Sequence, residues 1–346
     1  MKILAIQFRY LGDAALMTPA LRAIKEHFPG VALHVLVAKE VAPLLEHLPW
    51  LERVWAFPRM RGKARLAQSW PLIRELRRQR FDRSVDFSAN DRSALISLAC
   101  GASQRLAAAR PGGFFGRRFC YTQTLALPRG GHQALSNLHL LSAWGIALPE
   151  APQIEICVDP ACAGLAEQLV PRPIILCHIA TSQPKKEWPL NSWVELYRHA
   201  SAAGHELMFS TGVTPRERVL VEQFKKLAPD APVLPVLPDL ATFLAVIGRA
   251  RLFVCGDTGP LHFAAGLGVP TIGLFGPSSP RIWAPLGRQH RTAQSKECGC
   301  GGDTAVCLRA NPCMAAISPK TVFELISQAL AESPTRREPK APCGQK

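Results

Sequence analysis

The chain has 346 residues, of which 48% are hydrophobic and 19% are charged. This composition excludes a chain that is disordered throughout, and the length fits two domains of ordinary size. The formal net charge of +15 favours acidic partners such as phosphorylated substrates, anionic lipids or nucleic acid. The sequence has no apolar run of about 18 residues, and its apolar start is too short for a signal peptide, so we expect a cytoplasmic protein.

Short apolar runs alternate with helical periodicity along most of the chain. The runs predicted to be strands are Ile3–Ile6, Leu33–Val37, Arg83–Phe87, Ile174–His178, Glu206–Phe209, Leu252–Cys255 and Thr271–Leu274. The segments predicted to be helices are Ala20–His27, Ser192–Ala203, Pro215–Leu227, Leu240–Ile247 and Pro319–Ala331. Repeated strand–helix units of this kind predict the α/β class, with parallel sheets that carry helices on both faces.

A proline-rich stretch interrupts this pattern near the middle of the chain. Five prolines lie between residues 149 and 173, and a new strand is predicted directly after them. We therefore expect two α/β domains, over residues 1–160 and 161–332. Residues 333–346 are polar, charged and proline-bearing, which predicts a disordered tail.

Asp13 follows the first predicted strand, in the segment Arg9–Asp13. Ligands of open parallel sheets bind at the carboxyl ends of the strands, where this loop lies. Two interpretations are open for Asp13. It can cap the first helix, a position that aspartate favours, or it can serve as a catalytic carboxylate.

The second half of the chain opens with a polar loop after its first strand. Thr181 and Ser182 supply hydroxyls, and Lys185 and Lys186 supply ammonium groups. Hydroxyl donors beside a cation suit the phosphates of a nucleotide. The alternative is an ordinary basic surface loop, since the glycine and lysine spacing of a P-loop is absent.

A second anion site is predicted at the segment from Gly256 to His262. A strand ends there in a turn with two glycines, and a helix is predicted to start near Pro260. The N–H groups and the positive end of a helix favour anions. Thr258 adds a hydroxyl, and Gly259 allows a phosphate to approach the backbone. The alternative is a plain strand–turn–helix connection.

The positive charge is concentrated between residues 59 and 83. Nine basic residues in this segment face only two acidic ones; they are Arg59, Arg61, Lys63, Arg65, Arg74, Arg77, Arg78, Arg80 and Arg83. Such a segment can bind a polyanion, form a solvated basic face or contact nucleic acid. We expect no nucleic-acid partner, because the aromatic residues are not interleaved with the basic ones.

Four cysteines form a cluster in a glycine-rich stretch near the end of the second half. They are Cys298, Cys300, Cys307 and Cys313. Four thiolates suffice for a tetrahedral zinc site. Their spacing departs from the paired CxxC motifs of zinc ribbons, so we predict loop cysteines without a metal.

Several motifs resemble glycosyltransferase family 9, the bacterial ADP-heptose:lipopolysaccharide heptosyltransferases. The first is the segment from Gly12 to Leu21, with its Gly12-Asp13 and Thr-Pro-Ala-Leu elements. The resemblance covers roughly residues 1–330, with motifs in both halves in the family's order. The other matching elements are Asp86-Phe87, Arg92-Ser93, Gly101-Ala102, His132-x4-Asn137-Leu138, Thr181-Ser182, Lys186-x-Trp188-Pro189, Asp257-Thr258-Gly259-x-x-His262 and Phe275-Gly276-Pro277-Ser278.

The resemblance implies a GT-B fold, in which two Rossmann-like domains face a cleft and the second domain holds the donor. It implies an inverting transfer of heptose from ADP-heptose without a cofactor. By motif, Asp13 matches the general base, and Lys186 matches the lysine at the diphosphate. The other residues that match donor-binding positions are Thr181, Ser182, Asp257, Thr258, Gly259 and His262, together with Glu217 at the ribose hydroxyls.

The implied acceptor is a phosphorylated lipid A that carries Kdo. A polyanion of this kind gives the basic segment a specific interpretation, and the charge would also draw the protein to an anionic inner-leaflet surface. We therefore expect a cytoplasmic enzyme peripheral to the inner membrane. The expected acceptor-binding residues are Arg74, Arg77, Arg78, Arg80 and His132, with Arg110, Arg117 and Arg118 as further candidates. The alternative activity is that of another GT-B enzyme with a different nucleotide sugar.

Overall fold

The structure is a computed structural model that describes residues 1–58, 66–128, 130–295 and 313–332. The chain divides into two compact units, with the division between Cys157 and Val158. The boundary expected from the proline-rich stretch lies three residues further on. The predicted tail, residues 333–346, lies outside the described residues. No described helix is both long enough and apolar enough to cross a membrane.

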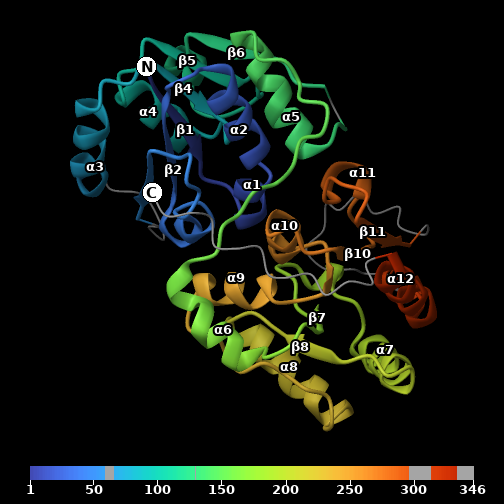
Figure 1. The fold of residues 1–346 in the computed structure, drawn as a ribbon. Helices are drawn as coiled ribbons and strands as arrows, with labels where there is room; N and C mark the ends of the chain where they lie inside the picture. Colours follow the sequence, from blue (N-terminus) through green and yellow to red (C-terminus); the bar gives the residue numbers. More distant parts are fainter. Residues whose placement is uncertain (59–65, 129, 296–312, 333–346) are drawn as a thin grey trace. The chain divides into compact units, whose positions relative to one another are not determined.

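Unit 1 is built on a sheet of six parallel strands (Figure 1). The strand order is β3-β2-β1-β4-β5-β6, which is the order of the Rossmann fold. The central strand β1 is buried from its second residue onward, as expected for a strand covered by helices on both faces. The strands are β1 (Lys2–Gln7), β2 (Ala32–Ala38), β3 (Arg53–Phe57), β4 (Arg83–Asp86), β5 (Gln104–Ala108) and β6 (Gln123–Leu125).

Unit 2 repeats this arrangement, but a single β-bridge takes the place of one edge strand. Its five parallel strands have the order β11-β10-β9-β7-β8. On the outer side of β8, Phe209 of that strand forms a single parallel bridge with Val233. The Rossmann order places its third strand at this position. The strands are β7 (Ile175–His178), β8 (Leu207–Ser210), β9 (Leu252–Gly256), β10 (Thr271–Phe275) and β11 (His290–Gln294).

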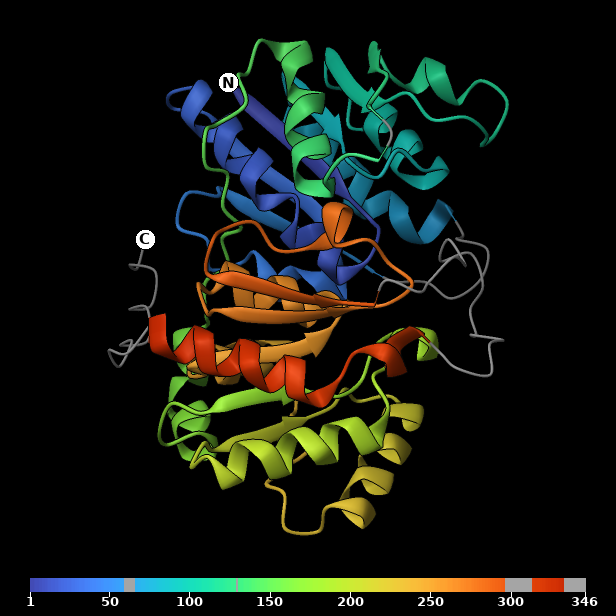
Figure 2. The same cartoon turned by 90° about the vertical axis from the view of Figure 1, so that its right-hand side faces the viewer.

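Helices connect the strands and cover the sheets (Figures 1 and 2). In unit 2, α7 packs against α8 and α12, while α9 packs against α6 and α10, which makes two separate helix layers. The helices of unit 1 are α1 (Leu11–Ala15), α2 (Thr18–His27), α3 (Leu66–Arg78), α4 (Asp91–Ala99) and α5 (Gln133–Leu140). Those of unit 2 are α6 (Ala163–Leu169), α7 (Leu190–Ala202), α8 (Pro215–Leu227), α9 (Leu240–Gly248), α10 (Gly259–Gly266), α11 (Pro280–Trp283) and α12 (Pro319–Glu332).

Every strand predicted from an apolar run is present within about one residue of its predicted bounds. The four strands that were not predicted are β3, β5, β6 and β11. Each contains polar or exposed positions. The edge strands β6 and β11 have few apolar residues, while β3, also at an edge, is apolar in sequence but has exposed positions. An edge strand buries less of its surface, so its sequence carries a weaker apolar signal.

Candidate active site

Two loops at the carboxyl edge of the unit 1 sheet are joined by buried hydrogen bonds. The hydroxyl of Ser88, after β4, donates to Oε1 of Gln7 (2.8 Å) and accepts from the N–H of Phe8 (2.6 Å). The same Gln7 oxygen accepts from the N–H of Arg9 (3.0 Å). Because Gln7 and Ser88 are buried, water does not compete for these bonds, and the paths of both loops are fixed.

Asp13 lies on α1, just beyond the end of β1, and is only 6% exposed. Its Oδ2 accepts from the N–H of Tyr10 (3.3 Å), and its Oδ1 lies 3.7 Å from Nη1 of Arg9. Burial raises the pKa of Asp13, while the charges of Arg9 and Arg110 and the Tyr10 hydrogen bond oppose that rise. A carboxyl with its pKa shifted by burial and by specific charges is typical of an acid–base group.

Asp13 does not occupy the N-cap position that was the alternative interpretation. The N-cap residue of α1 is Tyr10, and Asp13 is the third residue of the helix. Its carboxylate supports the helix start by accepting the N–H of the cap residue and by its charge in the first turn. Asp13 therefore has a structural role at the start of α1, as the third residue of the helix.

A second carboxylate, Asp86, lies fully buried at the end of β4. Its Oδ1 accepts from the N–H groups of Ser88 (2.9 Å) and Ala89 (3.0 Å), and its Oδ2 accepts from the hydroxyl of Tyr121 (2.6 Å). Burial raises the pKa of Asp86 in spite of these bonds. Ala89 has φ of 48°, a conformation that costs energy for a residue with a side chain. Asp86 therefore stabilises a strained turn.

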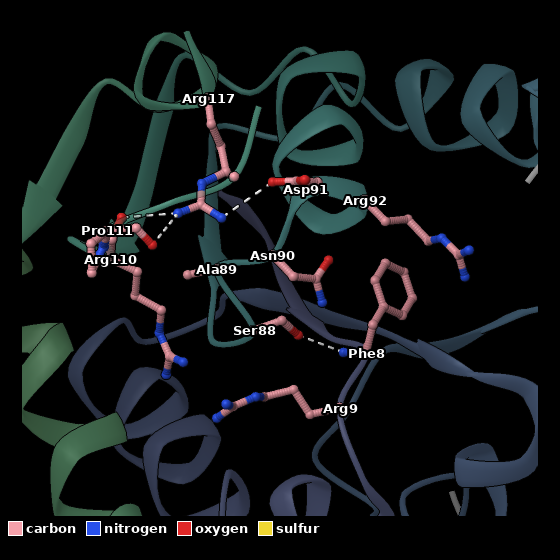
Figure 3. A pocket seen from close by; sticks show the side chains of 11 residues that line it. Phe8, Arg9, Ser88, Ala89, Asn90, Asp91, Arg92, Arg110, Pro111 and Arg117 are labelled. Carbon is pink, nitrogen blue, oxygen red and sulfur yellow. Dashed lines mark hydrogen bonds and ion pairs between the residues drawn. The ribbon is translucent and has the colours of Figure 1, made fainter. Parts of the chain in front are cut away.

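A cavity of about 560 Å³ opens beside these loops and is lined by Arg9, Arg92, Arg110 and Arg117 (Figure 3). Nη1 of Arg117 donates to Oδ1 of Asp91 (3.2 Å), and Nη2 donates to the carbonyl of Arg110 (2.9 Å). Within the described part of the chain, Arg92 and Arg110 form no ion pair. Burial and the like charge of Arg9 lower the pKa of Arg110. The cavity is therefore suited to phosphate or carboxylate groups.

Helix α5 supports the segment that carries Asp13. The side-chain amide of Asn137 donates to the carbonyl of Leu16 (3.1 Å), directly after α1. The hydroxyl of Thr18 accepts from the N–H of Glu155 (2.9 Å). The predicted acceptor residue His132 is the N-cap of α5, where its Nδ1 accepts from the N–H of Ala134 (3.2 Å). His132 therefore has a structural role at the start of this helix.

The predicted arginine row lies at the opposite edge of the unit 1 sheet. Arg74, Arg77 and Arg78 occupy the second half of α3, and Arg80 follows it; all four are exposed. Asp82, two residues later, contacts Lys2 at the start of β1, whereas Asp13 follows the end of β1. A six-residue strand separates these edges by roughly 20 Å. The basic residues from 59 to 65 lie outside the described residues.

In unit 2, the structure brings together two predicted donor residues, Lys186 and Asp257. Nζ of Lys186 lies 2.6 Å from Oδ2 of Asp257, and the two side chains are 19% and 7% exposed. A Cβ at Gly256 would lie 2.9 Å from the carbonyl oxygen of Lys186 and 2.9 Å from the methyl group of Thr181. Only glycine permits this close approach of the loops after β7 and β9.

The loop after β7 is tied to the start of α8. Thr181 is buried, its hydroxyl donates to the carbonyl of Gln183 (2.6 Å), and its N–H donates to Glu187. The guanidinium of Arg216 donates to the carboxylate of Glu187 and to the carbonyl of Thr181. Ser182 is exposed at the turn of the loop. These contacts hold the predicted phosphate-binding loop in one conformation.

The remaining donor candidates stand at the starts of two helices. Thr258 is the N-cap of α10 without a side-chain capping bond, Gly259 is the first residue of the helix, and His262 is buried one turn further on. Glu217 is the third residue of α8, where its Oε2 accepts from the N–H (3.0 Å) and the hydroxyl (2.6 Å) of Thr214. Glu217 therefore has a capping role.

Comparisons with known proteins identify the family of the chain. Residues 69–306, more than half of the chain, match the model of "Glycosyltransferase family 9 (heptosyltransferase)". The chain belongs to glycosyltransferase family 9. It is 23% identical over 296 residues to lipopolysaccharide heptosyltransferase 3 of Escherichia coli. The match covers 80% of this chain and 84% of that protein.

Two solved structures of E. coli heptosyltransferases show the same fold as this family 9 chain. ADP-heptose lipopolysaccharide heptosyltransferase II is 20% identical, with a TM-score of 0.78 over 97% of this chain and 100% of that one. Heptosyltransferase WaaC with ADP is 18% identical, with a TM-score of 0.75 over 95% of this chain and 100% of that one. The predicted fold class, α/β of the GT-B type with two Rossmann-like parallel sheets, is confirmed.

Several residues that shape the candidate site were not indicated by the sequence. Gln7 and Ser88 join the two loops of unit 1, and Glu187 and Arg216 join those of unit 2. Their contacts link positions far apart in the chain, so no local pattern indicates them. Asp86 had a sequence signal, because it stands at the end of a predicted strand and in one of the motifs that resemble family 9. Among the described residues, no cluster of three potential metal ligands occurs, and Cys298, Cys300 and Cys307 lie outside those residues.

Proposed function

We propose that this protein transfers heptose from ADP-heptose to the inner core of lipopolysaccharide, with inversion at the anomeric carbon and with Asp13 as the general base. The observation that carries the proposal is the position of Asp13. It is a buried carboxyl at the carboxyl edge of unit 1, with Arg9 and Arg110 beside it and a cationic cavity adjoining. The names of the heptosyltransferase relatives support the sugar and the acceptor.

In the proposed reaction, the acceptor hydroxyl attacks the anomeric carbon of the heptose while Asp13 takes its proton. The bond from that carbon to the diphosphate oxygen breaks on the opposite face, so the configuration inverts and ADP leaves. A carboxylate is a weak base for a sugar hydroxyl, so proton transfer has to accompany attack in a fixed geometry. The buried hydrogen bonds around Gln7, Ser88 and Asp86 supply that rigidity.

The donor is proposed to bind to unit 2. Charge grows on the ADP as it departs, and the ammonium of Lys186 and the N–H groups at the start of α10 stabilise it. Thr181, Ser182 and Thr258 supply hydroxyls, and Gly259 allows the diphosphate to approach the helix. Asp257 holds Lys186 in position. The other proposed donor contacts are His262 at the sugar and Glu217 at the ribose.

The acceptor is proposed to be a phosphorylated lipid A that carries Kdo, bound to unit 1 at an anionic membrane surface. Arg92 and Arg110 meet its phosphate or carboxylate groups in the cavity beside Asp13. The row of Arg74, Arg77, Arg78 and Arg80 and the imidazole of His132 remain predicted acceptor contacts. Because the row lies at the other edge of the sheet, it would meet groups distant from the reacting hydroxyl.

The direct test incubates the purified protein with ADP-heptose and lipopolysaccharide truncated before the inner-core heptoses. Mass spectrometry of the lipid should show the addition of one heptose, and NMR of the product should show the inverted anomer. Parallel reactions with UDP- and GDP-sugars test the alternative donor. Transfer from one of these sugars but not from ADP-heptose would replace the proposed donor, and a retained anomer would remove Asp13 as base.

A further inference from the structure

The segment between β5 and β6 exposes three phenylalanine side chains on one loop. Phe115 is fully exposed, Phe119 is 66% exposed and Phe114 is 37% exposed. The segment, residues 109–122, extends from the edge of the unit 1 sheet and appears in teal-green at the upper right of Figure 2. Large apolar side chains that gather in water mark a surface that contacts something else. We call residues 109–122 the phenylalanine loop.

The phenylalanine loop has a rigid base. The guanidinium of Arg117 bonds to the carbonyls of Arg110 (2.9 Å) and Pro111 (3.4 Å), and it forms an ion pair with Asp91. The N–H of Phe114 also donates to Asp91 (3.3 Å). At Gly113, φ is 91° and a Cβ would lie 2.5 Å from the Arg117 and Asp91 side chains, so only glycine fits. The chain therefore presents its phenylalanines from a defined turn.

The surroundings of the phenylalanine loop are strongly basic. Between Asp91 and Glu150 the sequence has no acidic residue, while it has the six arginines Arg92, Arg105, Arg110, Arg117, Arg118 and Arg129. Arg118 is exposed and lies over the ring of Phe119, with its guanidinium carbon 4.8 Å from the ring centre. Apolar rings beside guanidinium groups combine the two interactions that hold a protein at an anionic lipid surface.

We propose that the phenylalanine loop inserts Phe115 and Phe119 into the interface of an anionic lipid bilayer, while Arg118 contacts the lipid phosphates. The proposal rests on the proposed function, since a lipid-linked acceptor lies in such a surface. The loop leaves the sheet at the carboxyl end of β5, and Arg110 at its base also lines the cavity beside Asp13. Insertion would therefore bring the acceptor-binding cavity to the membrane.

Vesicle flotation of the full-length protein tests the proposal. The vesicles contain phosphatidylglycerol and phosphatidylethanolamine, with pure phosphatidylcholine vesicles for comparison. The double variant Phe115→Ser/Phe119→Ser should lose vesicle binding by roughly tenfold or more, since two exposed rings no longer leave water. Arg118→Gln should weaken binding to the anionic vesicles only. Phe115→Trp/Phe119→Trp should retain binding, because tryptophan also favours the interface.

The matched control is Leu148→Ser/Val236→Ser, which removes two apolar side chains that are 57% and 56% exposed elsewhere. This control should bind vesicles as the wild type does. If the serine variant of the loop floats like the wild type, or if the control loses binding equally, the proposal is wrong. If the serine variant of the loop loses binding to polyuridine but still binds vesicles, the loop is a nucleic-acid contact and the proposal is wrong.

Activity separates this proposal from the proposed function. Transfer to a water-soluble, delipidated acceptor should be the same in the serine variant and the wild type, because the phenylalanines lie outside the proposed active site. Transfer to the same acceptor in vesicles should fall in the serine variant. If the wild type transfers no heptose to either acceptor, the proposed function fails while the flotation result still decides the role of the loop.

Discussion

The carboxyl edges of the two sheets differ in how their charges are balanced. In unit 2, Lys186 pairs with Asp257, Arg216 pairs with Glu187, and Glu217 accepts from Thr214. In unit 1, four arginines line a cavity that has one carboxylate, and Asp13 carries a pKa raised by burial. One edge is internally neutralised and the other has excess positive charge.

This difference indicates how each edge would meet a ligand. An anion at the unit 2 edge has to compete with Asp257 for Lys186. Its binding therefore replaces part of an existing ion pair and adds little net charge pairing. An anion at the unit 1 edge adds a partner to Arg92 and Arg110, which have none among the described ion pairs. Donor binding should therefore depend less on ionic strength than acceptor binding does.

The largest expected effect comes from Asp13→Asn. If Asp13 is the general base, kcat should fall by about 10²- to 10⁴-fold. The melting temperature should not fall, because the amide oxygen can still accept the Tyr10 N–H and a buried charge is removed. Steady-state kinetics, ADP calorimetry and thermal denaturation check this. A variant that keeps more than about a tenth of the wild-type kcat would contradict the role.

The second largest effect is expected from Lys186→Met, which breaks the Lys186–Asp257 pair at the unit 2 edge. Loss of the cation should lower kcat by roughly 10²-fold or more and weaken ADP binding. It also leaves Asp257 buried without its partner, so the melting temperature should fall. The double variant Lys186→Met/Asp257→Leu should recover stability without activity. Full activity in the single variant would remove Lys186 from the site.

A smaller effect should come from the excess charge of unit 1. Arg92→Gln/Arg110→Gln should raise the acceptor KM by roughly tenfold at low salt, leave the donor KM unchanged, and show less difference from the wild type at high salt. The comparison is the quadruple glutamine variant of Arg74, Arg77, Arg78 and Arg80. If that variant raises the acceptor KM and the cavity pair does not, the α3 row binds the acceptor.

The smallest effect concerns pH. Burial raises the pKa of Asp13, and the Arg9 charge limits that rise. A base has to be ionised, so kcat should decline as the pH falls through the pKa of Asp13. Arg9→Gln removes a charge that favours the carboxylate, so the acid limb of the pH–rate profile should move to higher pH. A shift in the opposite direction would show that another group controls the limb.

The sequence predicted the fold well because buried parallel strands are continuous apolar runs. It also indicated Asp13, Lys186 and Asp257, since each lies in the segment that follows such a run. It could not indicate that Lys186 pairs with Asp257, because 71 residues separate them. Arg92 stands in one of the motifs and Arg110 was a candidate acceptor residue, but only the pairing of β4 with β5 shows that the two line one cavity.

The link between Asn137 and Leu16 has a consequence for synthesis on the ribosome. Helix α1 has five residues, too few to be stable alone. The contacts just beyond α1 come from much later in the chain. Asn137 binds the carbonyl of Leu16, and Glu155 binds Thr18 at the start of α2. The segment with Asp13 therefore has to wait, during translation, until almost all of unit 1 has emerged. A nascent chain arrested before residue 137 would carry this aspartate without its native surroundings.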